Sequence, residues 1–172
     1  MAPINPSYGT LITMNTPLSS KHLQAFIETH RLAAVILSMD AHTATVSDAA
    51  RALDVSADLI IKSLVFMAEE QPILVINNGL ARVDRKKLAV YLGINRKRVK
   101  LARAEQALSV TGYMVGSMPP FGHREDLRTL VDTATAELDT VYGGGGDIDA
   151  MMQLSSSELL QVAHAEVADI SE

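Results

Sequence analysis

Two short apolar runs separated by a polar turn constrain the fold of this chain more than any other feature of its sequence. Residues 63–68 read SLVFMA and residues 73–76 read ILVI, with the turn-like residues EEQP between them. Uninterrupted apolar runs of this length are typical of strands that are buried on both faces. We therefore expect an antiparallel pair of buried strands here, with Asn77, Asn78 and Gly79 closing the second strand by turn chemistry.

Other segments place helices and shorter strands around this pair. Capping residues predict helices that begin at Ser19 or Ser20, at Ser47, at Asp84 and, through a capping box between Ser155 and Glu158, at 156–163. Further strands are expected at 33–37, 99–101, 130–132, 141–142 and 151–154. The expected fold is one α+β domain over residues 19–172, with a mixed or mostly antiparallel sheet and surrounding helices. Residues 1–18 hold three of the six prolines and are expected to form an irregular N-terminal arm.

Composition excludes several kinds of chemistry. The chain has no cysteine, which removes disulfides, cysteine nucleophiles and thiolate metal sites. Its five histidines form no H-x-x-x-H or H-E-x-x-H pair, so no metal site and no cofactor are expected. A G-x-S-x-G elbow is also absent. No apolar run approaches the roughly 18 residues of a membrane span, and no signal peptide is recognisable, so we expect a cytoplasmic protein without a membrane partner.

Charge is distributed unevenly along the chain. The net charge is −5, but residues 82–103 hold nine basic residues against one acidic residue. This segment therefore carries +8 and could steer a polyanion to one face. A basic helix and turn that only meet solvent would have the same composition, and the sequence leaves both possibilities open. The residues proposed to contact nucleic acid are Arg82, Arg85, Lys86, Lys87, Arg96, Lys97 and Arg98.

Lys62 is the first candidate for a site residue. It stands between Leu59-Ile60-Ile61 and Ser63-Leu64-Val65-Phe66, where a lysine is costly unless its ammonium reaches an anion or a cavity. A lysine on an edge strand that extends its ammonium to water is the simpler alternative.

Two glycine-containing segments are further candidates. The loop Gly116-Ser117-Met118-Pro119-Pro120-Phe121-Gly122 is rigid, and the amides of Gly116, Ser117 and Met118 could point at a developing oxyanion. An ordinary tight turn has the same composition. The run Gly143–Gly146 would let a ligand or another backbone approach closely, although composition favours a flexible hairpin turn. His123 lies beside the first loop, where a histidine is more often a polar rim residue than a general base.

The ordered set of these motifs resembles the YbaK/ProX-type prolyl-tRNA editing-domain family over residues 20–170. The resemblance rests on five segments: IIKSLVF at 60–66, RVDRKKLAVYLG at 82–93, TGYMVGSMPPFGH at 111–123, VYGGGG at 141–146 and LSSSELLQVA at 154–163. It implies an aminoacyl-tRNA deacylase that removes wrongly attached amino acids in trans, with mischarged tRNA as partner and an aminoacyl-tRNA synthetase as a second one. The alternative left open is a module of the same fold that binds tRNA or a synthetase without turnover.

The resemblance also implies roles for individual residues. Lys62 would contact the phosphate or ribose at the acceptor end of tRNA, and Gly116 with its neighbours would bind the ester carbonyl, making these the two catalytic candidates. The substrate-binding candidates are Ser63, Ser117, Met118, Pro119, Pro120, Gly144, Gly145 and Met151. Met151 stands where the cysteinyl- and alanyl-specific branches carry a polar residue facing the amino-acid pocket. A specificity for cysteine or alanine is therefore not carried over to this chain.

Overall fold

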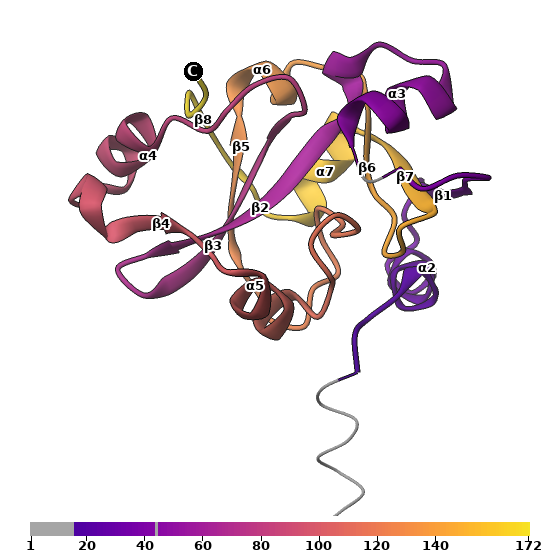
Figure 1. Cartoon of the computed structure of the whole chain (residues 1–172), viewed down its shortest axis with the longest axis horizontal. Helices are drawn as coiled ribbons and strands as arrows, with labels where there is room; N and C mark the ends of the chain where they lie inside the picture. The colour runs from indigo at the N-terminus through magenta and orange to yellow at the C-terminus, as the bar shows by residue number, and fades with distance from the viewer. Residues whose placement is uncertain (1–15, 44) are drawn as a thin grey trace, which may run out of the picture.

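The computed structural model describes residues 16–43 and 45–172, which form an α+β fold with two sheets (Figure 1). The larger sheet is mixed and has the strand order β4-β2-β3-β5-β8, and the smaller one is antiparallel with the order β1-β7-β6. The α+β class with mixed and antiparallel strands was expected, whereas the division into two sheets was not. Most of the predicted N-terminal arm, 1–18, lies outside the described residues.

A hairpin forms the centre of the larger sheet. β2 (Ile61–Ala68) and β3 (Gln71–Asn78) pair antiparallel over their whole length, as predicted. Only Glu69 and Glu70 join them, and both have positive φ, 51° and 70°, as a two-residue type I′ turn requires. Both strands are longer than predicted, because Lys62 belongs to β2 and Asn77 and Asn78 belong to β3 instead of to a turn.

Shorter strands extend this hairpin on both sides. β4 (Val99–Leu101) pairs only with Phe66–Ala68 of β2, so the first half of β2 has no neighbour from β4. On the other side, β5 (Arg128–Asp132) is parallel to β3, and β8 (Glu166–Ala168) is parallel to β5. The free first half of β2 is the edge of the sheet at which the site described below is found.

The smaller sheet stands against this free edge. It consists of β1 (Val35–Ser38), β6 (Thr140–Gly144) and β7 (Ala150–Ser155), with β7 in the middle. A parallel bridge between Ile60 and Tyr142 connects β6 to the residue just before β2. Strands from two distant parts of the chain thus meet at the start of β2.

Helices surround the two sheets (Figure 1). Their bounds are α2 (Ser20–Thr29), α3 (Val46–Leu53), α4 (Arg85–Leu92), α5 (Ala104–Thr111), α6 (Thr133–Ala136) and α7 (Ser156–Val162), with single 3-10 turns at η2 (Ala57–Leu59) and η3 (Arg96–Arg98). Asp84 caps α4 and Gly93 ends it in a left-handed conformation, both as predicted. No helix in the described part of the chain is long and apolar enough to cross a membrane.

Two caps differ from the prediction. Thr45, and not Ser47, caps α3, because its hydroxyl accepts the amide of Asp48 at 3.0 Å. Ser155 caps α7 as expected, but Glu158 does not complete the capping box. Its carboxylate instead accepts a hydrogen bond from the amide of Ala33 at 2.6 Å, which connects α7 to the residues before β1.

The two faces of the central hairpin are buried in separate clusters. Leu74 and Ile76 pack with α2, α7 and the loop before β5, whereas Ile73 and Val75 pack with α4 and the C-terminal residues. This alternation follows from the two-residue period of a strand. It also places Lys62, paired with Asn77, on the face that carries α4.

Candidate active site

A cleft of about 220 Å³ opens at the free edge of β2. It lies between the start of β2, α3, the loop after Tyr113 and the β6–β7 hairpin. Six of the predicted site residues line it, namely Lys62, Ser63, Gly116, Met118, Gly144 and Met151. These residues come from four separate segments of the chain, so the fold brings most of the predicted substrate site together.

Among the described residues, Lys62 is the only one with a charged side chain in the lining of this cleft. Its Nζ donates a hydrogen bond to the carbonyl oxygen of Ala81 at 2.7 Å, and no carboxylate within the described residues forms an ion pair with it. Burial lowers the pKa of Lys62, and the neighbouring positive charge of Arg82 lowers it further. An anion bound in the cleft would supply the negative charge that Lys62 lacks and would favour its charged form.

The carbonyl oxygen of Ala81 also accepts a second hydrogen bond. Asn77, fully buried and paired with Lys62 in the hairpin, donates its Nδ2 to the same oxygen at 3.3 Å and to Ser171 Oγ at 3.2 Å. The C-terminal residues clamp this segment, since Glu172 donates its amide to Arg82 O at 2.9 Å. The position of the Lys62 ammonium therefore depends on the C-terminal end of the chain.

The remaining walls of the cleft are uncharged. Met118 and Met151 are both nearly fully buried, and the hydroxyl of Ser63 is buried without a hydrogen-bond partner among the described residues. Thr43 and Thr45 also line the cleft, but each hydroxyl is already engaged, with Ile148 O and with Asp48 respectively. These walls offer no charge of their own, and among the three hydroxyls only Ser63 Oγ has no hydrogen-bond partner in the described part of the chain.

The loop after Tyr113 begins with a tight turn. The amide and hydroxyl of Ser117 both donate to Met114 O, at 3.1 and 3.0 Å. Gly116 occupies the third position of this turn with a φ of +96°, which is typical of a type II turn and favours glycine. The expectation that the Ser117 amide is available to a ligand is therefore wrong. The amides of Gly116 and Met118, in contrast, donate no hydrogen bond within the described part of the chain.

The glycine run allows backbones to touch. A Cβ added to Gly144 would lie 2.3 Å from Met118 O and 2.8 Å from the carbonyl carbon of Ser117. The amide of Gly146 donates to Ser117 O at 2.9 Å, which fixes the loop against the hairpin. The hairpin turn favoured by composition is therefore found for half of the run: Gly143 and Gly144 belong to β6, whereas Gly145 and Gly146 lie in the connection between β6 and β7.

Four of the predicted substrate-binding residues, Ser117, Pro119, Pro120 and Gly145, do not line the cleft. All four are buried, and Gly145 donates its amide to Ala150 O at 3.1 Å. His123 Nε2 donates to Pro119 O at 2.7 Å, and burial lowers the pKa of His123. His123 is likewise not part of this cleft lining, and its hydrogen bond to Pro119 O holds the loop.

The basic segment divides into two groups, one before and within α4 and one from η3 to Arg103, and α4 lies next to η3 and β4. Arg82, Arg85, Lys86 and Lys87 precede or belong to the start of α4, and Lys87 is bound to Asp169 at 2.8 Å. The second group continues from η3 through β4 and borders a cavity of about 940 Å³, which we call the basic groove. It is lined by Met67, Glu69, Glu70, Lys97, Arg98, Lys100, Leu101, Arg103 and Gln106. The described residues contain no cluster of three or more His, Asp or Glu side chains that could hold a metal ion.

Sequence reasoning missed the α3 wall of the cleft. Thr43, Thr45, Val46 and Ala49 line it, together with Val115 from the loop. The sequence placed the start of this helix at Ser47, two residues too late, and nothing local indicates that the helix faces β2. Asn77 was read as a turn residue, although a buried asparagine opposite a lysine in a hairpin is a detectable signal for a supporting hydrogen bond.

Comparison with known proteins places this arrangement in a family. The model of the aminoacyl-tRNA editing domain matches residues 40–162. An uncharacterized protein, YwhH, of Bacillus subtilis is 29% identical over 133 residues, which cover 77% of this chain and 83% of the relative. A proline–tRNA ligase of Latilactobacillus sakei is 33% identical over 110 residues, which cover 64% of this chain but 19% of the ligase. The chain thus corresponds to about a fifth of that ligase.

A solved structure matches nearly the whole chain. It is described as a proposed trans-editing enzyme for prolyl tRNA synthetase and superimposes with a TM-score of 0.81 at 28% identity. The alignment covers 99% of both chains. The arrangement of two sheets and helices described above is therefore the arrangement of that protein as well.

Proposed function

The chain belongs to the aminoacyl-tRNA editing domain family, and on that premise we propose that it is a deacylase that hydrolyses the ester of mischarged tRNA. The observation that carries this proposal is the pairing of one unneutralised cation, Lys62, with free backbone amides at Gly116 and Met118 on the same cleft. The aminoacyl end of tRNA has the matching chemistry, because a phosphate and ribose lie next to an uncharged ester carbonyl.

Lys62 would bind the phosphate or ribose of the terminal nucleotide. Its ammonium is partly buried and forms no ion pair within the described residues, so a phosphate would gain a charge-assisted hydrogen bond without breaking an ion pair. The bond to Ala81 O, supported by Asn77, would hold the ammonium in position before the substrate arrives. Preorganisation of this kind lowers the cost of orienting the substrate.

The amides of Gly116 and Met118 would stabilise the reacting carbonyl. Water adds to the carbonyl carbon of the ester, the carbonyl oxygen becomes an oxyanion, and the ribose oxygen leaves and is protonated to a hydroxyl. The products are a free amino acid and uncharged tRNA. Backbone amides aimed at the oxyanion supply stabilisation that typically amounts to about 3–4 kcal/mol per donor. An ester is reactive enough that this mechanism needs no side-chain nucleophile.

The uncharged walls support a small or medium, uncharged amino acid as the one removed. Met118 and Met151 offer adaptable apolar surface, and neither they nor Ser63 could neutralise a charged side chain. Discrimination by size in such a pocket amounts to about 1–3 kcal/mol per methylene, so we expect graded activity on several esters.

The partners follow from the same premise. The related proline–tRNA ligases contain this domain within much longer chains, which supports tRNA, and secondarily a synthetase, as the partner of the present chain. Such a substrate would be met in the cytoplasm. The direct test is to incubate the protein with one tRNA charged in turn with alanine, cysteine, serine, threonine and proline and to follow the release of each amino acid.

A further inference from the structure

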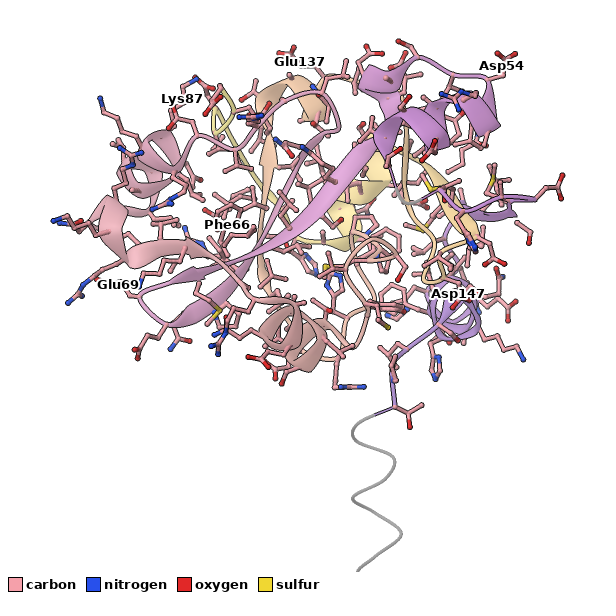
Figure 2. All side chains as sticks on the ribbon, viewed as in Figure 1. Asp54, Phe66, Glu69, Lys87, Glu137 and Asp147 are labelled. Atoms are coloured by element: carbon pink, nitrogen blue, oxygen red, sulfur yellow. The ribbon has the colours of Figure 1, made fainter. Side chains whose placement is uncertain are left out.

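The basic groove lies at the opposite end of β2 from the cleft. Lys62 lines the cleft and Met67 lines the groove, five residues apart on one strand. At a rise of about 3.3 Å per residue they are separated by about 16 Å. Figure 2 shows Glu69 at the hairpin tip beside the groove, well away from α3, which forms the wall of the cleft (Figure 1).

Two lysines of the groove have no acidic partner. Arg98 is bound to Glu69 at 2.7 Å and Arg103 to Glu105 at 3.2 Å, so these charges are partly neutralised within the protein. Lys97 and Lys100, both exposed, form no ion pair within residues 16–43 and 45–172. The groove thus presents at least two cations that remain available to a polyanion.

Met67 lies beside one of these lysines. It is half-buried and pairs with Lys100 between β2 and β4, so the two side chains lie on the same face of the sheet. Leu101, which is 58% exposed, pairs with Phe66 and therefore lies on the opposite face. Exposed lysines beside an apolar side chain suit a nucleic-acid strand, because the phosphates can meet the lysines while a sugar covers Met67.

We propose that the basic groove binds the backbone of the tRNA acceptor stem through Lys97 and Lys100 while the aminoacyl end occupies the cleft. This proposal rests on the proposed function and adds a second contact to it. Stacked nucleotides advance by about 3.4 Å along one strand, so a separation of about 16 Å corresponds to about five nucleotides from the reacting ester. That position falls where the unpaired 3′ end of tRNA gives way to the first base pairs of the stem.

A matched pair of basic residues lies outside both sites. Lys21 belongs to α2 and Arg31 follows it; both are exposed and, like Lys97 and Lys100, form no ion pair in the described part of the chain. They border neither the cleft nor the groove. The two pairs are therefore matched in charge and exposure and differ in location, which makes one a control for the other.

The test compares K97Q/K100Q with K21Q/R31Q on two substrates. One is an aminoacyl-tRNA that the wild type hydrolyses, and the other is the same amino acid esterified to the trinucleotide CCA, which is too short to reach the groove. We expect K97Q/K100Q to raise KM for aminoacyl-tRNA roughly tenfold with unchanged kcat, and to leave hydrolysis of the trinucleotide ester unchanged. K21Q/R31Q should behave as the wild type on both substrates.

The salt dependence of tRNA binding measures how many phosphate contacts each variant loses. Loss of two phosphate contacts should reduce the slope of log Kd against log salt by about two, whereas K21Q/R31Q should leave the slope unchanged. The proposal is overturned if K97Q/K100Q keeps the wild-type KM and salt slope, or if K21Q/R31Q shows the larger loss. If the wild type hydrolyses neither substrate, the proposed function fails, while the salt slopes still decide whether the groove binds tRNA.

Discussion

Adding a single methyl group at Gly144 should move the loop that carries the proposed carbonyl-binding amides. In the structure, the Cβ of Gly144→Ala would lie 2.3 Å from Met118 O and 2.7 Å from the carbonyl carbon of Met118. Ordinary contacts of this kind lie near 3.5 Å, so the loop and β6 must separate by about 1 Å. Both partners are backbone, which leaves no flexible side chain to absorb the change.

The displacement has two measurable consequences. Overpacking of this kind typically costs about 1–3 kcal/mol of folding free energy, which corresponds to a fall in Tm of about 2–12 °C for a chain of this size. A misplacement of about 1 Å at a reacting group costs on the order of a hundredfold in rate. We therefore expect Gly144→Ala to lose about a hundredfold in kcat/KM on aminoacyl-tRNA while the protein remains folded.

Gly93→Ala is the matched control. Gly93 also has a special backbone, with φ of +69° at the end of α4, but a Cβ there would have no atom within 4 Å. It should lose roughly 1 kcal/mol from the left-handed conformation and keep its activity per folded molecule. Thermal melts give the change in stability, and single-turnover deacylation measured well below the lower Tm gives the change in activity, so the two effects are separated. If Gly144→Ala retains deacylation within twofold of the wild type, the loop does not position the reacting carbonyl.

Three further predictions concern single side chains. Lys62→Met should abolish most deacylation yet leave Tm unchanged or raised at neutral pH. The pKa of Lys62 is lowered on folding, so the unfolded chain binds the proton more tightly, and the charged Lys62 reduces stability at every pH below its folded pKa. A lower Tm with retained activity would instead show that Lys62 has a structural role. Met151→Ala should extend deacylation toward bulkier amino acids and Met151→Asp toward polar ones, and an unchanged substrate ranking in both would remove Met151 from the pocket. Hydrogen bonds from Arg128 hold the pKa of Glu166 at about 2, against an ordinary value of 4.5, so its stabilising contribution should be present above pH 4.5 and disappear as pH falls toward 2. In acid titrations followed by circular dichroism, Glu166→Gln should lack this part of the acid-induced loss of stability, and an acid transition identical to that of the wild type would contradict the assignment.

Structural features that depend on only a few neighbouring residues are predicted well from the sequence. The β2–β3 pair, the Asp84 cap and the Gly93 stop are local features, and all three were correct. The helix α5 was missed because its N-cap is Arg103, which accepts no capping bond, and because it buries little more than Ala107 and Thr111. β8 was missed because three residues at the edge of a sheet have no detectable period.

The site was partly predictable for the same reason. Lys62 and Gly116 stand out by their immediate neighbours, whereas the α3 wall depends on packing between segments that are distant in sequence. The use of the Ser117 amide within its own turn depends on the backbone conformation at Gly116, which composition does not specify. The +8 segment was visible as one block of charge, but only its second part, from Lys97 to Arg103, lines the basic groove, which depends on how β4 and the β2–β3 hairpin pack together.

Release of amino acid from charged tRNA tests the central claim most directly. Purified protein should be incubated with one tRNA carrying alanine, cysteine, serine, threonine or proline, beside the Lys62→Met variant and a sample without enzyme. We expect the wild type to release at least one of the small amino acids well above spontaneous hydrolysis, with graded rates among the others, and Lys62→Met to approach the spontaneous rate. If the wild type binds the charged tRNA yet releases none of the five above the spontaneous rate, the chain is a binding module and the assignment as a deacylase is wrong.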